Sequence, residues 1–195
     1  MIAPRLRTSA GALLPLDVSR WLSPAAPEDD EVLARAQPAV LDVGCGPGRH
    51  VLALVRRGRV ALGIDPSPHA VAMAHRRGAP VLRRSVFERV PGAGRWGSAL
   101  VLDGSIGIGG DPAALLRRVA GLLRPGGRIL AELDEPGAGL QLLRVRVEAG
   151  PDRSHWFPWA RLGTDALGPV ADAAGLSCLD VWGVRQRWFC ELRRE

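Results

Sequence analysis

Several residue types are missing from the chain or scarce in it. It has 195 residues but no lysine, asparagine or tyrosine, and aromatic side chains make up only 5% of it. Without tyrosine and lysine it lacks the Tyr with Lys arrangement used in hydride transfer, which disfavours a nicotinamide-dependent oxidoreductase. No apolar run approaches the roughly 20 residues of a membrane span, and no N-terminal segment has the apolar core of a signal peptide. We therefore expect a soluble, cytoplasmic protein that does not bind membranes.

Cysteine is also scarce. The three cysteines, Cys45, Cys178 and Cys190, are an odd number and lack the spacing of metal ligands. This pattern argues against a disulfide framework and against a zinc site, and it fits a reducing interior. We therefore predict no bound metal.

The charged residues are unbalanced in type. All 26 basic residues are arginine, against 20 acidic residues, and the net charge is +6. Arginine raises the isoelectric point further than lysine does, so the isoelectric point of about 10.9 does not by itself indicate nucleic-acid binding. Arginine pairs such as those at 56–57 and 76–77 mostly close predicted helices, where cations complement the negative end of the helix dipole. We favour solvated helix ends over an RNA-binding surface and expect no nucleic-acid partner.

The most informative segment is a glycine-rich turn between two apolar strands. Residues 40–65 read as strand, glycine turn, helix, strand and acidic residue, with Gly44, Gly46 and Gly48 on alternate positions. Glycine lets the backbone turn sharply there and lets a ligand approach where a Cβ atom would collide. Asp65 ends the second strand, where a carboxylate can accept hydrogen bonds from ribose hydroxyls. The segment predicts a site for a nucleotide-type cofactor.

The spacing of these glycines narrows the choice of cofactor. A dinucleotide fingerprint is G-x-G-x-x-G, with the pyrophosphate on the helix N-terminus, whereas this loop is G-x-G-x-G. Asp42 precedes the loop, and its carboxylate would repel a pyrophosphate. It suits a cationic ligand end instead, such as the amino acid ammonium of S-adenosylmethionine (SAM).

Residues 42–48, Asp-Val-Gly-Cys-Gly-Pro-Gly, closely resemble the first motif of class I SAM-dependent methyltransferases. The likeness continues, in order and at the family's usual intervals, through residues 63–67, 98–103 and 122–130. The resemblance implies a doubly wound α/β fold with a seven-stranded, mostly parallel sheet whose last strand is antiparallel. It also implies SAM as the cofactor and S-adenosylhomocysteine (SAH) as its product.

The resemblance also implies the cofactor-binding residues, because the ligand of such a sheet lies beyond the carboxyl ends of its strands. Many family members bind the adenine amino group with an acidic residue or Asn after the third strand, whereas this chain has Ser85. The Ser85 hydroxyl or the amides of Val86 and Phe87 can substitute, and Phe87 either stacks near the adenine or packs in the core. Cys45 is expected to be a small packing residue beside the cofactor. The predicted cofactor-binding residues are Asp42, Gly44, Cys45, Gly46, Gly48, Asp65, Pro66, Ser85, Val86, Phe87, Asp103 and Gly104.

One domain is the default for a chain of this length with 47% hydrophobic residues. We assign residues 1–36 to an N-terminal lid, loose over residues 1–19 and helical at 28–35. Residues 37–195 form the methyltransferase domain. After strand five, alternating apolar and polar residues predict a β-hairpin inserted at about residues 138–163.

Helix starts have their own signals. Ser67 and Asp111 are each followed by proline, which is typical of an N-cap and the first helical position. Thr164 is expected to cap the helix that follows it. Two last strands, at 176–184 and 187–192, are joined by a tight turn.

The predicted insertion carries most of the candidate substrate residues. His155, Trp156 and Trp159 belong to a dense aromatic group in a chain poor in aromatics. The group suggests an apolar pocket for a small molecule or, equally, a hydrophobic hairpin that closes over the sheet. Trp21 is a further substrate candidate as a lid residue, with anchoring of the N-terminal segment as the alternative. His155 is the first candidate for a general base and Asp103 is the second.

The loop at residues 103–111 bears on the acceptor. It lacks the Pro-Pro-aromatic clamp of amino-methylating relatives, which disfavours methylation of nucleic-acid adenine, and its glycines allow backbone contact with cofactor or substrate. We predict direct, SN2-type methyl transfer from SAM to an O, N, S or C atom of a small molecule. A SAM-fold binding or scaffold protein without methyl transfer is the alternative, and an oxidoreductase is a weaker one.

Overall fold

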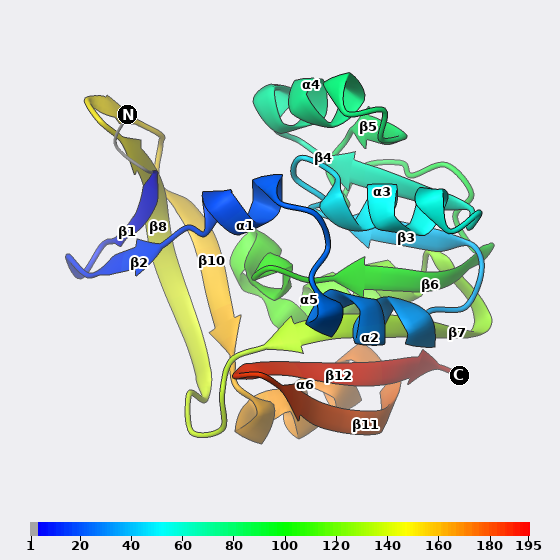
Figure 1. Ribbon diagram of the computed structural model, residues 1–195. Helices are drawn as coiled ribbons and strands as arrows, with labels where there is room; N and C mark the ends of the chain where they lie inside the picture. Colours follow the sequence, from blue (N-terminus) through cyan, green and yellow to red (C-terminus); the bar gives the residue numbers. More distant parts are fainter. Residues whose placement is uncertain (1–3) are drawn as a thin grey trace.

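The computed structural model describes residues 4–195 and contains two β-sheets (Figure 1). The larger sheet has seven strands in the order β11-β12-β7-β6-β3-β4-β5. Neighbouring strands from β7 to β5 are parallel, while β12 is antiparallel to both β7 and β11. The seven strands are β3 (Val40–Val43), β4 (Ala61–Asp65), β5 (Val81–Arg83), β6 (Trp96–Val101), β7 (Leu123–Leu133), β11 (Leu176–Val184) and β12 (Arg187–Arg194).

Helices cover both faces of this sheet (Figure 1). Leu33 of α2 and Leu54 of α3 are buried against one face, and Leu115 of α5 and Val170 of α6 are buried against the other. The strand order and the two helical layers confirm the predicted doubly wound fold with an antiparallel last strand. Within residues 4–195, no helix is both long and apolar enough to cross a membrane. The helices of this domain are α2 (Pro27–Arg35), α3 (Arg49–Arg56), α4 (Pro68–Arg76), α5 (Pro112–Ala120) and α6 (Leu167–Ala174), with 3₁₀ segments η1 (Ser105–Gly110) and η2 (Thr164–Ala166).

Two of the predicted helix starts are confirmed. Ser67 and Asp111 each accept a hydrogen bond from the backbone N–H three residues on, at 3.2 and 2.9 Å, and proline follows each cap. The cap predicted at Thr164 is wrong, because α6 begins at Leu167 without a side-chain cap. The Thr164 N–H instead donates to the Asp134 carbonyl at 3.2 Å and ties η2 to the end of β7.

The smaller sheet joins the predicted insertion to the N-terminal segment. Its strands pair in the order β10-β8-β1-β2, with β9 on β8. The inserted hairpin is confirmed as β8 and β10, but the expectation that residues 1–19 are loose is wrong over residues 5–15. β1 has only four residues and pairs with β8 about 140 residues later in the chain, where Arg7 donates to Glu148 at 2.9 Å. The strands are β1 (Arg5–Thr8), β2 (Leu13–Pro15), β8 (Leu140–Ala149), β9 (Asp152–Arg153) and β10 (Phe157–Leu162).

The two sheets meet at the carboxyl ends of the parallel strands. In Figure 1 the arrowheads of β3, β4, β6 and β7 point toward the smaller sheet, and helix α1 (Val18–Leu22) lies between the two sheets. α1 is also fixed from the other side, because Arg77 at the end of α4 donates to the Leu22 carbonyl at 3.1 Å. The smaller sheet and α1 therefore cover the edge at which such folds bind their ligands.

Candidate active site

The glycine loop has the conformation that its sequence predicts. Gly44, Gly46 and Gly48 have φ angles of +69°, +52° and +80°, in the left-handed region that glycine adopts readily. A Cβ atom on Gly48 would lie 2.8 Å from the Ala79 methyl carbon, and one on Gly44 would lie 2.6 Å from the Ser105 Oγ. The loop therefore requires glycine for its backbone angles and, at these two positions, for close packing.

Asp65 fixes this loop from the end of β4. Its two carboxylate oxygens accept hydrogen bonds from the backbone N–H groups of Gly46 and Ser67, at 2.9 and 2.8 Å. Burial, helped by the nearby charge of Asp42, raises the pKa of Asp65 against the opposing effect of these two hydrogen bonds. Pro66 follows at the turn into α4. The carboxylate thus lies between the glycine loop and α4, where the sequence predicts a ribose contact.

Asp42 precedes the glycine loop in β3, and Cys45 lies within the loop. Asp42 is only 2% exposed, and its Oδ2 has no hydrogen-bond partner within residues 4–195. A Cβ atom on Gly63 would lie 2.5 Å from the Cys45 sulfur, so the thiol fills the space next to β4. Burial, with the charges of Asp42 and Asp65, raises the pKa of the Cys45 thiol. This environment fits the packing role expected for Cys45.

The loop after β5 is held by a hydrogen bond within the loop and by one from Arg118 of α5. The Phe87 N–H donates to the Ser85 hydroxyl at 3.3 Å, and the Arg118 guanidinium donates to the Val86 carbonyl at 2.8 Å. Phe87 is 50% exposed, which excludes the alternative that it packs in the core. Its ring contacts η1, where a Cβ atom on Gly109 would lie 2.9 Å from the ring. The predicted adenine-binding residues therefore form one ordered turn.

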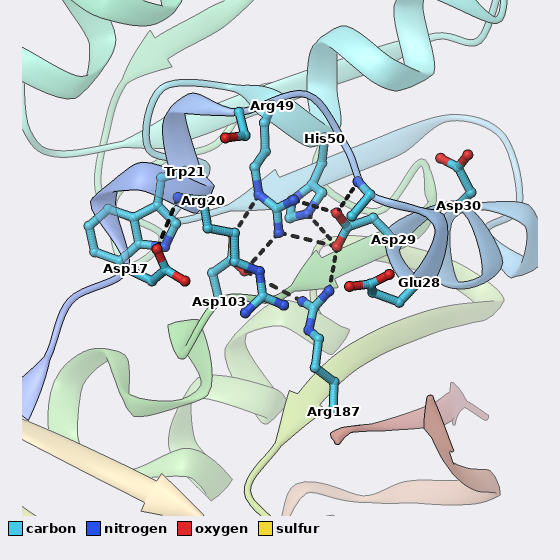
Figure 2. Close-up of polar contacts among 12 residues, drawn as sticks. Asp17, Arg20, Trp21, Glu28, Asp29, Asp30, Arg49, His50, Asp103 and Arg187 are labelled. Atoms are coloured by element: carbon cyan, nitrogen blue, oxygen red, sulfur yellow. Dashed lines mark hydrogen bonds and ion pairs between the residues drawn. The ribbon is translucent and has the colours of Figure 1, made fainter. Parts of the chain in front are cut away.

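The polar centre of the site is a network of buried charges (Figure 2). Arg49, at the start of α3, donates to both Asp29 of α2 and Asp103, which follows β6. Arg187 of β12 donates to Asp29 at 2.6 Å and to both oxygens of Glu132 at 2.8 Å. All of these side chains are buried or nearly so. Five elements that are far apart in the sequence are thus joined by paired charges.

His50 extends this charge network toward the glycine loop. Its Nδ1 lies 3.7 Å from Asp42 Oδ2 and its Nε2 lies 3.5 Å from Asp29 Oδ1. Burial acts to lower the pKa of His50, but the carboxylates of Asp29 and Asp42 raise it to about 9. The imidazole is therefore a cation at neutral pH and belongs to the charge balance of the network.

Asp103 and Gly104 form a turn, here called the Asp103 turn, between the glycine loop and the smaller sheet. Asp103 has a φ of +53°, and its N–H donates to Glu132 at 2.7 Å. Burial acts to raise the pKa of Asp103, but the charges of His50, Arg49 and Arg187 lower it. Both of its oxygens accept from Arg49, at 3.0 and 2.8 Å. This geometry suits a positioning role better than the role of proton acceptor.

A partly open cavity of about 290 Å³ lies next to the Asp103 turn. It is lined by Asp103 and Glu132 from the larger sheet, Leu6 and Trp159 from the smaller sheet, and Arg20 and Trp21 from α1. The structure thus brings together Asp103, Gly104, Trp21 and Trp159 from the predicted site.

The aromatic residues of the insertion do not all line the cavity. His155 and Trp156 are exposed, precede β10 and are not among the residues that line the cavity. The Arg146 guanidinium stacks 4.8 Å from the Trp156 ring on the outside of the smaller sheet. The structure therefore does not bring His155 to Asp103. Trp159 packs toward η1 instead, where a Cβ atom on Gly107 would lie 2.6 Å from its ring, so this glycine serves the contact between η1 and β10.

Residues 40–127 match the family model described as a methyltransferase domain. That match covers a little under half of the chain. Uncharacterised proteins of Mycobacterium tuberculosis and Mycobacterium bovis are each 36% identical to it over 131 residues. The match covers 65% of this chain and 44% of the relative, so the chain spans less than half the length of these curated relatives.

Solved structures show which fold the chain shares. A SAM-dependent methyltransferase from Bacteroides fragilis, in complex with SAH, is 24% identical and has a TM-score of 0.78, covering 97% of this chain and 86% of that one. The 1,6-didemethyltoxoflavin-N1-methyltransferase of Burkholderia thailandensis, with bound 1,6-didemethyltoxoflavin and SAH, is 22% identical with a TM-score of 0.68, covering 91% and 81%. Both share the class I methyltransferase fold with this chain.

Sequence reasoning predicted Asp103 but missed the other four residues of the charge network. Asp29 and Arg187 were not among the predicted site residues. Glu132 could have been found from the sequence, because it is an acidic residue inside the apolar run Ile-Leu-Ala-Glu-Leu. Arg49 could have been found as well, because it directly follows the glycine loop. A buried acidic residue is almost always paired, so Glu132 predicts a partner but does not identify it.

Proposed function

We propose that this chain is a SAM-dependent methyltransferase that transfers a methyl group directly to an atom of a small molecule. The observation that carries the proposal is the position of the Asp103 turn. Asp103 and Gly104 line the cavity, and the hydroxyl of Ser105, the next residue, donates to the Gly44 carbonyl of the glycine loop at 3.5 Å. A cofactor and an acceptor held on either side of one turn can meet end to end, as an in-line transfer requires.

The residues of the methyltransferase domain fit SAM. The buried carboxylate of Asp42, whose Oδ2 accepts no hydrogen bond within residues 4–195 and lies 3.7 Å from His50, is suited to the ammonium of the amino acid part. Asp65 is suited to the ribose hydroxyls. The turn at Ser85, Val86 and Phe87 is suited to the adenine. When bound, SAM supplies a methyl group that its sulfonium makes electrophilic. The SAH bound to the relatives from Bacteroides fragilis and Burkholderia thailandensis supports the same cofactor here.

The task of the protein is then to orient the acceptor and to exclude water. The Asp103 turn is held by Arg49 and Glu132, and α1 and the smaller sheet cover the cavity. Proximity and orientation of this kind can supply on the order of 7–11 kcal/mol of the barrier. The small molecule bound to the Burkholderia thailandensis relative supports a small-molecule acceptor here.

Calorimetric titration with SAH tests the proposal, with NADH titrated in parallel. We expect saturable SAH binding to the wild type and loss of binding in Asp65→Ala, because the substitution removes the carboxylate that orders the glycine loop. Asp172→Ala is the matched control, since it removes an exposed carboxylate on α6. Thermal unfolding of each variant checks that it is folded. Absence of SAH binding, or a preference for NADH, would contradict the proposal.

Binding of SAH alone does not establish transfer. Incubation with methyl-labelled SAM and a panel of small-molecule acceptors separates an enzyme from a protein that only binds SAM. We expect label to move to an acceptor in the wild type and not in Asp65→Ala. SAH binding without transfer to any class of acceptor would favour the binding or scaffold alternative.

A further inference from the structure

The Arg20 guanidinium differs from the buried arginines of the charge network. It lies 3.9 Å from Asp103 and 4.0 Å from Glu132, which is beyond hydrogen-bond distance. Within residues 4–195 the Arg20 side chain donates no hydrogen bond, whereas Arg49 and Arg187 each donate several. Its side chain is 29% exposed and lines the cavity. Arg20 therefore presents unused donors to a bound molecule.

Three of the four carboxylates around the cavity are, in contrast, already paired with arginine side chains. Asp103 accepts two hydrogen bonds from Arg49, and Glu132 accepts two from Arg187. Asp134, at the end of β7, accepts two from Arg161 of β10, at 3.0 and 2.6 Å. A cationic ligand would have to compete with these arginines, whereas an anionic ligand would find Arg20 available.

The rest of the lining favours a ligand with an apolar body. Leu6, Leu14, Leu133 and Trp159 are among the side chains that face the cavity opposite α1. A guanidinium binds a carboxylate through paired hydrogen bonds, and such bonds strengthen where water is excluded. Resting on the function proposed above, we propose that the acceptor is a small apolar acid whose carboxylate, or equivalent oxyanion, is bound by Arg20.

Asp17 allows a second test of the charge of the bound ligand. It caps α1 by accepting from the Arg20 N–H at 3.0 Å and from the Ser19 hydroxyl at 2.7 Å, and its carboxylate lines the same cavity. Asparagine caps helices about as well as aspartate, so Asp17→Asn removes the charge and keeps the helix start. The change should help an anionic ligand to bind and should weaken binding of a cationic one.

The experiment uses three probes of nearly equal shape: 1-naphthoate, neutral 1-naphthamide and cationic 1-naphthylmethylamine. Each is titrated calorimetrically into the full chain saturated with SAH. We expect naphthoate to bind about tenfold or more tightly than naphthamide, as charge-assisted bonding implies. We expect Arg20→Gln to remove this preference without changing naphthamide binding, and Asp17→Asn to strengthen naphthoate binding.

Other outcomes overturn the proposal. These are equal affinity for all three probes, failure of all three to bind to the SAH complex, or a preference for the amine that Asp17→Asn weakens. SAH and 5′-methylthioadenosine, which lacks the amino acid, are also titrated into Arg20→Gln. If SAH binding falls and methylthioadenosine binding does not, the carboxylate bound by Arg20 is that of the cofactor and the proposal fails. Failure of the wild type to bind SAH would instead reject the proposed function.

Discussion

The glycine loop and the charge network that His50 joins to it are built in different ways. In the glycine loop, Asp65 is bonded to backbone N–H groups of Gly46 and Ser67, which are 19 and 2 residues away. In the charge network, Arg187 is bonded to Asp29 and Glu132, which are 158 and 55 residues away. One region depends on local backbone conformation and the other depends on charges brought together by the whole fold. Substitutions should therefore affect binding in the first and stability in the second.

The largest effect is expected from Arg187→Met. The substitution leaves the buried carboxylates of Asp29 and Glu132 without a partner, which should lower the free energy of unfolding by about 3–5 kcal/mol. Urea denaturation of the two proteins measures the change. Arg193→Met removes an exposed arginine from the same strand and should change the free energy of unfolding little. Equally small losses in the two variants would show that the network does not stabilise the fold.

A smaller change in the free energy of unfolding is expected when the pH is raised. It comes from His50, which joins the charge network to the glycine loop. The pKa of His50 is raised from 6.5 to about 9 in the folded protein. The stability that its protonation contributes is therefore complete below about pH 6.5 and is lost as the pH rises through about 9. At about 1.4 kcal/mol per pKa unit, the loss is on the order of 3 kcal/mol.

Urea denaturation between pH 6.5 and 9 measures this slope, and His50→Gln should flatten it. Asp29, whose pKa is lowered, acts in the opposite sense, because its contribution is present above its ordinary pKa of 3.8 and is lost in acid. It does not titrate in the same window. An unchanged slope in His50→Gln would assign the pH dependence to other groups.

The same contrast explains how much of the fold the sequence predicts. The order of apolar strands, the glycine turns and the caps at Ser67 and Asp111 are local signals, and each predicts its element correctly. β1 is different, because four residues with little pattern become a strand only when they pair with β8. A strand whose partner lies far along the chain is decided by tertiary packing, which residue patterns do not contain.

The candidate site divides in the same way. Residues 42–48 and Asp65 predict the glycine loop, because its conformation depends on residues that lie close together in the sequence. The network partners of Asp103 come from α3, β7 and β12, and only the finished sheet brings these elements together. The sequence predicts either one pocket or a closing hairpin for the aromatic residues of the insertion, but β10 begins after His155 and Trp156 and leaves them exposed.

The glycine loop provides the smallest expected loss of stability and the clearest test of local control. Gly48 and Gly78 both have a φ of +80°, so an alanine at either position has the same unfavourable backbone angle. A Cβ atom on Gly48 would also lie 2.8 Å from the Ala79 methyl carbon, whereas one on Gly78 meets nothing within 4 Å. We therefore expect Gly48→Ala to lower the free energy of unfolding by about 1–2 kcal/mol more than Gly78→Ala does, because it overpacks the loop.

SAH binding should separate these two variants further. Gly48 ends the loop that is suited to hold the cofactor, and displacing it moves the N–H groups at the start of α3, whereas Gly78 follows the far end of α4. Calorimetry should therefore show SAH binding weakened about tenfold or more in Gly48→Ala and nearly unchanged in Gly78→Ala, since a small displacement of a positioned group has a large effect. Equal losses in the two variants would mean that strain at a left-handed glycine is transmitted through the whole domain. The glycine loop would then depend on the global fold as much as the charge network does.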